Sequence, residues 1–224
     1  MAHTSPSGVA PHPAIVLDVW SDLVSPWCYL AKARLRSAID AWERPPEVLL
    51  RHRAFELDPG MPRGGGPAGG SSAADTGDNV RLVTLAAAEG IRLDLASVVP
   101  ANTFDAHRLI ALGRMAGGPA EADAILERLF SAHLTEGLAI DDHAVLLRCA
   151  AEASLDERRV SAVLAGDDYA DEVLADEREA TRLGAMTVPF VLGNGRVALS
   201  GTQPVEAFTD LLRESLAPGV PGPA

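Results

Sequence analysis

The sequence predicts an α/β fold in which a small sheet carries an all-helical domain inserted between its second and third strands. Three observations predict this class. Two strand-like runs separated by a helix-like stretch come first. Helical patterns then follow one another from residue 79 to residue 184, with no strand pattern among them. Two short apolar runs around Asn194-Gly195 and a last helix complete the pattern, and Asn-Gly between apolar runs is a strong hairpin signal.

The first three elements are predicted to form one β-α-β unit. The strand Ile15–Trp20 is apolar and rich in β-branched residues, and the helix Trp27–Trp42 follows it after a short loop. Pro45 and Pro46 are expected to stop that helix before the second strand, Val48–Phe55. Two strands joined by a helix of this length are expected to be parallel and to have a right-handed crossover.

The helical domain is predicted to begin after a segment rich in Gly, Pro and Ser. This segment, residues 58–77, is longer than an ordinary connection, so we expect it to be disordered or to form a mobile lid. Gly184 stands where a helix-terminating glycine is expected. Six helices are predicted in this domain: Val80–Glu89, Thr103–Met115, Glu121–Leu134, Asp141–Ala153, Leu155–Leu164 and Asp168–Leu183.

The remaining elements return the chain to the sheet. Strands are predicted at residues 188–192 and 197–199, and a final helix at residues 204–216. Residues 1–13 and 217–224 are expected to be flexible tails, because they are rich in Pro and Gly and have little apolar surface to bury. The predicted division is a sheet-containing domain in two parts, residues 14–57 and 185–216, and a helical insertion domain, residues 79–184.

Composition and charge restrict the classes of function. The formal net charge of −12 argues against nucleic acid or an anionic membrane as a partner, because phosphate binding requires clustered cations. No apolar run approaches the ~20 residues that span a bilayer. The N-terminal residues lack the pattern of a secretory signal and only two cysteines are present, so the expected compartment is the cytoplasm. No metal site is predicted, because the histidines lack ligand spacing.

The motif Ser25-Pro26-Trp27-Cys28 stands at the junction of the first strand and the first helix. Redox sites with two cysteines separated by two residues occupy this position, at a helix N-terminus that stabilises a thiolate. Ser25 replaces the first cysteine, and two-electron dithiol exchange within one site needs two thiols. With Ser25 as the helix cap, Cys28 lies in the first turn, where the helix dipole is expected to lower its pKa to roughly 3.5–7.5.

Both residues of this motif also have ordinary structural interpretations. Ser25 followed by proline is a frequent helix start that stabilises a helix by ~1 kcal/mol. Cys28 could pack as a small hydrophobic residue, as free cysteines often do. The second cysteine, Cys149, lies on an apolar helical face and is expected to be a buried, inert thiol that does not pair with Cys28.

Six segments, taken together and in order, resemble one known family. They are Asp22–Leu30, Phe55–Pro59, Asn102–Arg108, Phe130–Gly137, Val188–Val191 and Ser200–Pro204. The family is the DsbA family, and within it the FrnE-type branch associated with polyketide biosynthesis. The resemblance implies a thioredoxin-like core with the helical domain inserted between strands two and three. The Ser-Pro-aromatic arrangement also resembles kappa-class glutathione transferases and 2-hydroxychromene-2-carboxylate isomerases, in which this serine hydrogen-bonds the sulfur of bound glutathione.

The resemblance implies roles for further residues. Pro189 is expected to follow a cis peptide bond and to lie against the sulfur of the site. A proline here also has an ordinary explanation, because the first residue of a strand does not need an N–H. His107 lies in the domain expected to cover the site and could transfer protons, or it could belong to an ordinary helix start. The predicted substrate-binding residues are Trp27, Val188, Pro189, Asn102 and Phe104, of which the aromatic ones could equally be core.

Three functions are compatible with these residues. The first is a thiol-dependent isomerase of an unsaturated small molecule, of polyketide type, with Cys28, Ser25 and His107 as catalytic residues. Its thiol is either Cys28 or a low-molecular-weight thiol, glutathione or mycothiol, held by Ser25. The second is a protein thiol-disulfide oxidoreductase or isomerase that uses an external thiol. The third is a non-catalytic binding protein. A carrier-bound substrate and a homodimer are left open.

Overall fold

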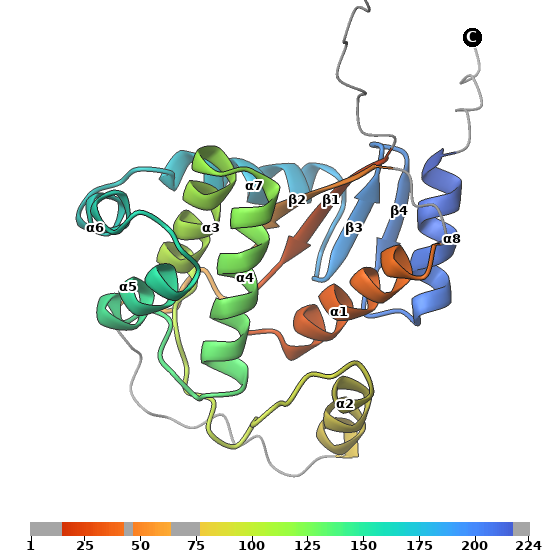
Figure 1. The fold of residues 1–224 in the computed structure, drawn as a ribbon, viewed down its shortest axis with the longest axis horizontal. Coiled ribbons are helices and arrows are strands. Elements are labelled where there is room, and N and C mark those ends of the chain that lie inside the picture. The colour runs from red at the N-terminus through yellow and green to blue at the C-terminus, as the bar shows by residue number, and fades with distance from the viewer. Residues whose placement is uncertain (1–14, 43–46, 64–76, 217–224) are drawn as a thin grey trace, which may run out of the picture.

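The computed structural model describes residues 15–42, 47–63 and 77–216 (Figure 1). The predictions for the tails 1–13 and 217–224, for Pro45-Pro46 and for most of the Gly-rich segment fall outside the described residues. The elements in chain order are β1 (Ile15–Ser21), α1 (Pro26–Asp40), β2 (Val48–Ala54), α2 (Gly77–Ala88), α3 (Phe104–Ala116), α4 (Pro119–Leu134), α5 (His143–Glu152), α6 (Glu157–Ala165), α7 (Ala170–Arg182), β3 (Phe190–Gly193), β4 (Val197–Ser200) and α8 (Val205–Leu216).

The four strands form one sheet in the order β2-β1-β3-β4. β1 and β2 are parallel, with Ile15 opposite Val48, and β1 and β3 are antiparallel, with Val19 opposite Val191. β3 and β4 form the predicted hairpin, in which Asn194 (φ 47°) and Gly195 (φ 66°) both adopt the left-handed conformation that a tight turn between twisted strands requires. The predicted α/β class, with helices inserted between strands two and three, is confirmed.

The two faces of β1 pack against different parts of the protein. Ile15, Leu17 and Val19 are buried in a cluster with α1 and α8, the two helices that cover one face of the sheet (Figure 1). The side chains between them point the other way, since strand residues alternate between faces. Trp20 there donates its indole Nε1–H to the carbonyl oxygen of Asp176 in α7, at 2.9 Å. β1 therefore joins the sheet to the helical insertion.

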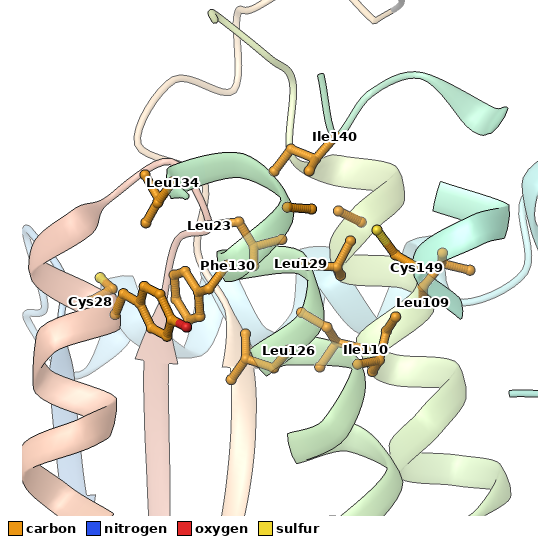
Figure 2. Close-up of a cluster of buried hydrophobic side chains, with 14 of the residues drawn as sticks. Leu23, Cys28, Leu109, Ile110, Leu126, Leu129, Phe130, Leu134, Ile140 and Cys149 are labelled. Atoms are coloured by element: carbon orange, nitrogen blue, oxygen red, sulfur yellow. The ribbon is translucent and has the colours of Figure 1, made fainter. Parts of the chain in front are cut away.

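The largest hydrophobic cluster lies mostly within the helical insertion (Figure 2). Leucines, isoleucines and Phe130 from α3, α4 and α5 fill it. Cys28 and Cys149 lie at opposite ends of this cluster, and both are free thiols (Figure 2). Cys149 is fully buried and burial raises the pKa of its thiol, as expected of an inert core cysteine.

Three helices of the insertion begin two residues later than the sequence pattern predicts. α5 begins at His143 because Asp142 caps it, accepting a hydrogen bond from the backbone N–H of Ala144 at 2.8 Å. α6 begins at Glu157 because Asp156 caps it, accepting a hydrogen bond from the backbone N–H of Arg159 at 2.9 Å. α7 begins at Ala170 because Tyr169 adopts a left-handed conformation (φ 65°), which a helix cannot include. Among the helices of the described ranges, none is long and apolar enough to cross a membrane.

Candidate functional site

Ser25 caps helix α1 and fixes the geometry of the site. Its backbone is extended (φ −95°, ψ 107°), and its Oγ accepts a hydrogen bond from the backbone N–H of Cys28 at 3.3 Å. Its own N–H donates to the carbonyl oxygen of Asp22 at 3.1 Å, which closes the turn before the helix. Pro26 then begins the helix at a position where its missing N–H costs nothing. The predicted cap is therefore present.

Cys28 lies in the first turn of α1, but its thiol is buried, with 2 % of the residue exposed. Burial raises the pKa of this thiol to about 12, whereas hydrogen bonds from the Ser25 side chain and the Asp22 backbone oppose the increase. The prediction of a lowered pKa was wrong. The helix N-terminus favours a thiolate, but the cost of removing a charge from water is larger at this depth.

The peptide bond between Val188 and Pro189 is cis, as predicted. Pro189 and Cys28 line the same small cavity, of about 20 Å³, together with Ser21 and Val191. The segment after β4 holds this region together, because the backbone N–H of Gly201 donates to the carbonyl oxygen of Pro189 at 2.8 Å. Serine cap, buried thiol and cis-proline thus meet at one end of α1.

Trp27 forms the exposed side of the same helix start. Its side chain is partly in solvent, with 36 % of the residue exposed. Its carbonyl oxygen accepts a hydrogen bond from the hydroxyl of Thr202 at 2.8 Å, so the segment that holds Pro189 also holds the first turn of α1. An exposed tryptophan at the edge of the site is available for contact with a ligand. Its predicted role in substrate binding stays a prediction.

His107 reaches the loop before Ser25 from the second turn of α3. Its Nε2 lies 3.6 Å from Oδ1 of Asp22, and both side chains are almost fully buried. The other carboxylate oxygen of Asp22 accepts a hydrogen bond from the backbone N–H of Leu57 at 2.7 Å. The structure therefore connects His107 to the site through Asp22, three residues before the serine cap.

Asn102 and Phe104 lie further from Cys28 than the sequence suggests, and neither lines its cavity. The Asn102 side chain donates to the carbonyl oxygen of Met61 at 2.8 Å and accepts from the N–H of Phe104 at 3.0 Å. Phe104 packs in a small cluster with Ala54 and Val173. These contacts join the segment after β2 to the start of α3. Contact of either residue with substrate stays a prediction.

Three polar residues beside the site escaped the sequence analysis: Asp22, Glu56 and His133. Glu56 is half-buried, and its pKa is raised to about 7, mainly by burial and then by the negative charge of Glu177. Asp22 and Glu56 follow the ends of β1 and β2, which pair in parallel with Ser21 opposite Ala54, so their loops lie side by side. Their one signal in the sequence is their place in the segments that carry the family resemblance. Within the described ranges, no group of three His, Cys, Asp or Glu residues is placed to hold a metal ion.

A four-stranded sheet with a helical insertion, together with a capped helix start beside a cis-proline, defines a DsbA-like thioredoxin fold. Residues 16–213 match the model of the DSBA-like thioredoxin domain, so the chain belongs to this family. A probable DsbA oxidoreductase from Streptomyces coelicolor is 34 % identical, with a TM-score of 0.83 over 94 % of this chain and 93 % of the other.

Two more distant structures share the fold. A 2-hydroxychromene-2-carboxylate isomerase is 19 % identical, with a TM-score of 0.66 over 89 % of this chain and 95 % of the other. The cytosolic disulfide reductase DsbM from Pseudomonas aeruginosa, with GSH, is 20 % identical, with a TM-score of 0.67 over 90 % of this chain and 98 % of the other. At these identities the likeness shows the fold alone. No curated protein matches the sequence.

Proposed function

We propose that this protein is a thiol-dependent isomerase of unsaturated small molecules, and that Ser25 holds the sulfur of a low-molecular-weight thiol, glutathione or mycothiol. One observation carries the proposal. The site combines a group of the type that binds sulfur, the hydroxyl of Ser25 at a helix N-terminus near a cis-proline and 6 % exposed, with an internal thiol that is buried and neutral. Such a site favours a sulfur that arrives from outside.

The protonation of Cys28 argues against it as the nucleophile. A thiol whose pKa is about 12 is ionised to about one part in 10⁵ at pH 7, and the thiolate is the reactive form. The Ser25 hydroxyl accepts from the Cys28 N–H through its oxygen, and its own hydrogen, which serves the Cys28 thiol in the unliganded protein, would turn to the sulfur of a bound thiol. A donated hydrogen bond and the dipole of α1 both stabilise an anion at this point.

The bound thiol supplies a reversible addition to a conjugated carbonyl compound. A carbon–sulfur bond forms at the alkene carbon remote from the carbonyl, the π electrons move to the carbonyl oxygen, and rotation about the resulting single bond precedes the reverse steps. The thiol is regenerated, so no oxidant or reductant is needed. His107 accepts the thiol proton, and the carboxylate of Asp22, 3.6 Å away, stabilises its charged form.

The finer parts of the proposal rest on the resemblance to the FrnE-type branch. They are a polyketide-type intermediate as substrate, free or carrier-bound. The cytoplasm as the compartment rests instead on the sequence, which has only two cysteines. The net charge of −12 supports a partner other than nucleic acid or an anionic membrane. A homodimer belongs to the same proposal and is tested by the mass of the protein in solution.

Binding of the thiol can be tested without the natural substrate. Glutathione or mycothiol is titrated into the protein, and the ultraviolet absorption of the bound thiolate is measured against pH. We expect binding with a lowered thiol pKa in the wild type and in Cys28→Ala, and loss of the thiolate signal in Ser25→Ala. If Ser25→Ala binds either thiol as the wild type does, or if neither thiol binds, the proposal is wrong.

Turnover is tested with cis-3-hexene-2,5-dione, a conjugated compound whose trans isomer is distinguished by NMR. We expect isomerisation that requires the added thiol and exceeds the protein-free rate. The activity of Ser25→Ala should fall by at least tenfold, because a hydrogen bond to a charged sulfur is removed. Activity of the wild type without any added thiol would assign the reaction to Cys28 instead.

The 34 % identical relative, a probable DsbA oxidoreductase, favours a second candidate function. In that reaction the Cys28 thiolate attacks a substrate disulfide, one substrate thiolate leaves, and an external thiol breaks the mixed disulfide at Cys28. The reaction needs a thiolate at Cys28, which burial disfavours. Rapid reduction of insulin in the presence of glutathione, lost in Cys28→Ala, would replace the isomerase proposal with this one.

A further inference from the structure

A second cavity lies directly beside the serine cap. Its volume is about 440 Å³, far larger than the cavity that holds Cys28. Val24, which immediately precedes Ser25, and Asp22, three residues before Ser25, form part of its wall. The other walls come from the segment after β2, the segment before α3, and α4. The lining residues are Asp22, Val24, Asp58, Met61, Val98, Val99, Pro100, Ala101, Thr103 and His133.

The wall made by the segment after β2 is held at both ends. Oδ2 of Asp22 accepts from the backbone N–H of Leu57 at 2.7 Å, and the Asn102 side chain donates to the carbonyl oxygen of Met61 at 2.8 Å. A turn between these points is closed by the N–H of Met61, which donates to the carbonyl oxygen of Asp58 at 3.1 Å. The cavity is therefore a built feature rather than a gap between loosely placed loops.

Two polar side chains of this cavity are buried and each has an atom without a hydrogen-bond partner among the described residues. They are Oδ1 of Asp22 and Nε2 of His133, and each residue is only 1 % exposed. Leaving such an atom unpaired destabilises the folded protein, so each one needs an explanation. Nε2 of His107, which also lacks a hydrogen-bond partner among the described residues, lies 3.6 Å from the Asp22 oxygen, within the range of an ion pair but too far for a hydrogen bond.

Both atoms are hydrogen-bond acceptors. A carboxylate oxygen can only accept. Nδ1 of His133 lies 3.1 Å from the carbonyl oxygen of Leu138, and because a carbonyl cannot donate, Nδ1 must carry the hydrogen. Burial lowers the pKa of His133, so the ring stays neutral and its Nε2 presents a bare lone pair. The pair therefore lacks donors, and a ligand must bring them.

The negative charge of the cavity wall selects against negatively charged ligands. Its wall contains the two acidic residues Asp22 and Asp58, and no Lys or Arg is among the described residues that line it. A carboxylate bound there would face these charges in a poorly solvated space, which costs more than it would in water. The remaining lining side chains are almost all apolar, so the body of the ligand must be apolar as well.

We propose that this cavity binds the substrate, and that Asp22 and His133 select an apolar ring or chain whose polar end donates hydrogen bonds, as a hydroxyl or amino group does, and exclude carboxylates. This inference rests on the proposed function, because it makes the cavity the place where the unsaturated molecule lies next to the sulfur held by Ser25. It adds the chemical class of the substrate.

Binding of three naphthalene probes to the whole protein tests the inference in the absence of any thiol. The probes are 2-naphthol, 2-(aminomethyl)naphthalene and 2-naphthoate, and their dissociation constants are measured by calorimetry. We expect at least one of the two donor probes to bind tenfold or more tightly than 2-naphthoate. The probe that binds more tightly shows whether the cavity prefers a hydroxyl or an amino group. If 2-naphthoate binds as tightly as both, the inference is wrong.

Variants assign the binding to this cavity. Asp22→Asn should weaken the stronger donor probe about tenfold, as loss of a charged acceptor predicts. Asp40→Asn is the matched control: it removes an equal charge from an exposed position at the end of α1 that does not line the cavity, and should leave affinity within about twofold. Val99→Trp, at a half-buried wall position, should abolish binding by filling the space. Unchanged affinity in Asp22→Asn or Val99→Trp would overturn the inference.

The thiol experiment and the probe experiment can fail separately. Ser25→Ala is expected to bind the donor probe with wild-type affinity, because Ser25 does not line this cavity. Loss of thiol binding with retained probe selectivity would refute the isomerase and leave the cavity's selectivity intact. Loss of probe selectivity with retained thiol binding would refute the substrate class alone.

Discussion

The reactivity of Cys28 is the sharpest prediction of the structure. A free cysteine with a pKa near 8.5 is ionised to a few per cent at pH 7, whereas a pKa of about 12 leaves about one part in 10⁵. Alkylation of the folded protein by iodoacetamide at Cys28 should therefore be about a thousandfold slower than alkylation of the same cysteine in urea. Mass spectrometry of the labelled peptide measures both rates, and a Cys149→Ala variant removes the second thiol.

The same shift makes stability depend on pH. A thiol whose folded pKa is raised contributes its full stability below the unfolded pKa of 9.0, and that contribution is lost as pH rises toward about 12. A shift of this size corresponds to about 4 kcal/mol at most. Urea unfolding from pH 8 to pH 11 should show a steeper loss of free energy in the wild type than in Cys28→Ala.

Two outcomes would refute this reasoning. One is labelling of native Cys28 at the rate of a free thiol, with a midpoint below pH 8.5. The other is an identical pH dependence of unfolding in the wild type and Cys28→Ala. Either would mean that the thiol is solvated or that the N-terminus of α1 outweighs burial, and Cys28 would return as a candidate nucleophile.

Three other perturbations have defined outcomes. Ser25→Cys restores a two-cysteine motif with Cys28, so insulin reduction should appear in this variant and be absent in the wild type. Asp176→Ala removes a buried carboxylate that lies 2.8 Å from Arg53 and accepts from the backbone N–H of Ala54, while Arg53 keeps Asp18 at 2.8 Å. The free energy of unfolding in urea should therefore fall by about 1–3 kcal/mol, and a loss below about 0.5 kcal/mol would contradict the burial of Asp176. Glu56 has a folded pKa of about 7, raised from 4.5, so its contribution to stability is lost as pH rises through that interval. Glu56→Gln should therefore be more stable than the wild type at pH 8 by about 1–2 kcal/mol, a value reduced because Glu56 is partly exposed. At pH 4 the variant should be no less stable than the wild type. Equal stability of the two proteins at both pH values would show that the pKa of Glu56 is not raised.

The parts of the fold that could be predicted are those determined by short sequence motifs. The hairpin follows from Asn194-Gly195, because left-handed conformations at both residues are what a tight turn demands. The start of α1 follows from Ser25 and Pro26, which cap and begin a helix whatever surrounds it. The start of α7 could not be read in this way, because the left-handed conformation of Tyr169 has no signature in its own sequence.

The electrostatics of the site were less predictable than its backbone. Position in a helix is a local property, and it suggested a reactive thiolate at Cys28. Burial is a long-range property, produced when α4 brings Phe130 and its neighbours over the helix start (Figure 2). The contact between Asp22 and His107 is similarly long-range. The sequence placed His107 near the site only through a family resemblance, and it contained no sign that Asp22 would be its neighbour.

The side chain of Asn102 has a consequence for the kinetics of ligand binding. Its amide and carbonyl groups are both hydrogen-bonded to backbone atoms, so it fixes Met61, a wall residue of the 440 Å³ cavity, before any ligand arrives. A ligand that binds to a loop already held in place does not have to order that loop. Ordering a mobile loop costs conformational entropy and so weakens binding. Association should accordingly be fast and follow a single exponential, with differences between ligands expressed in how slowly they leave.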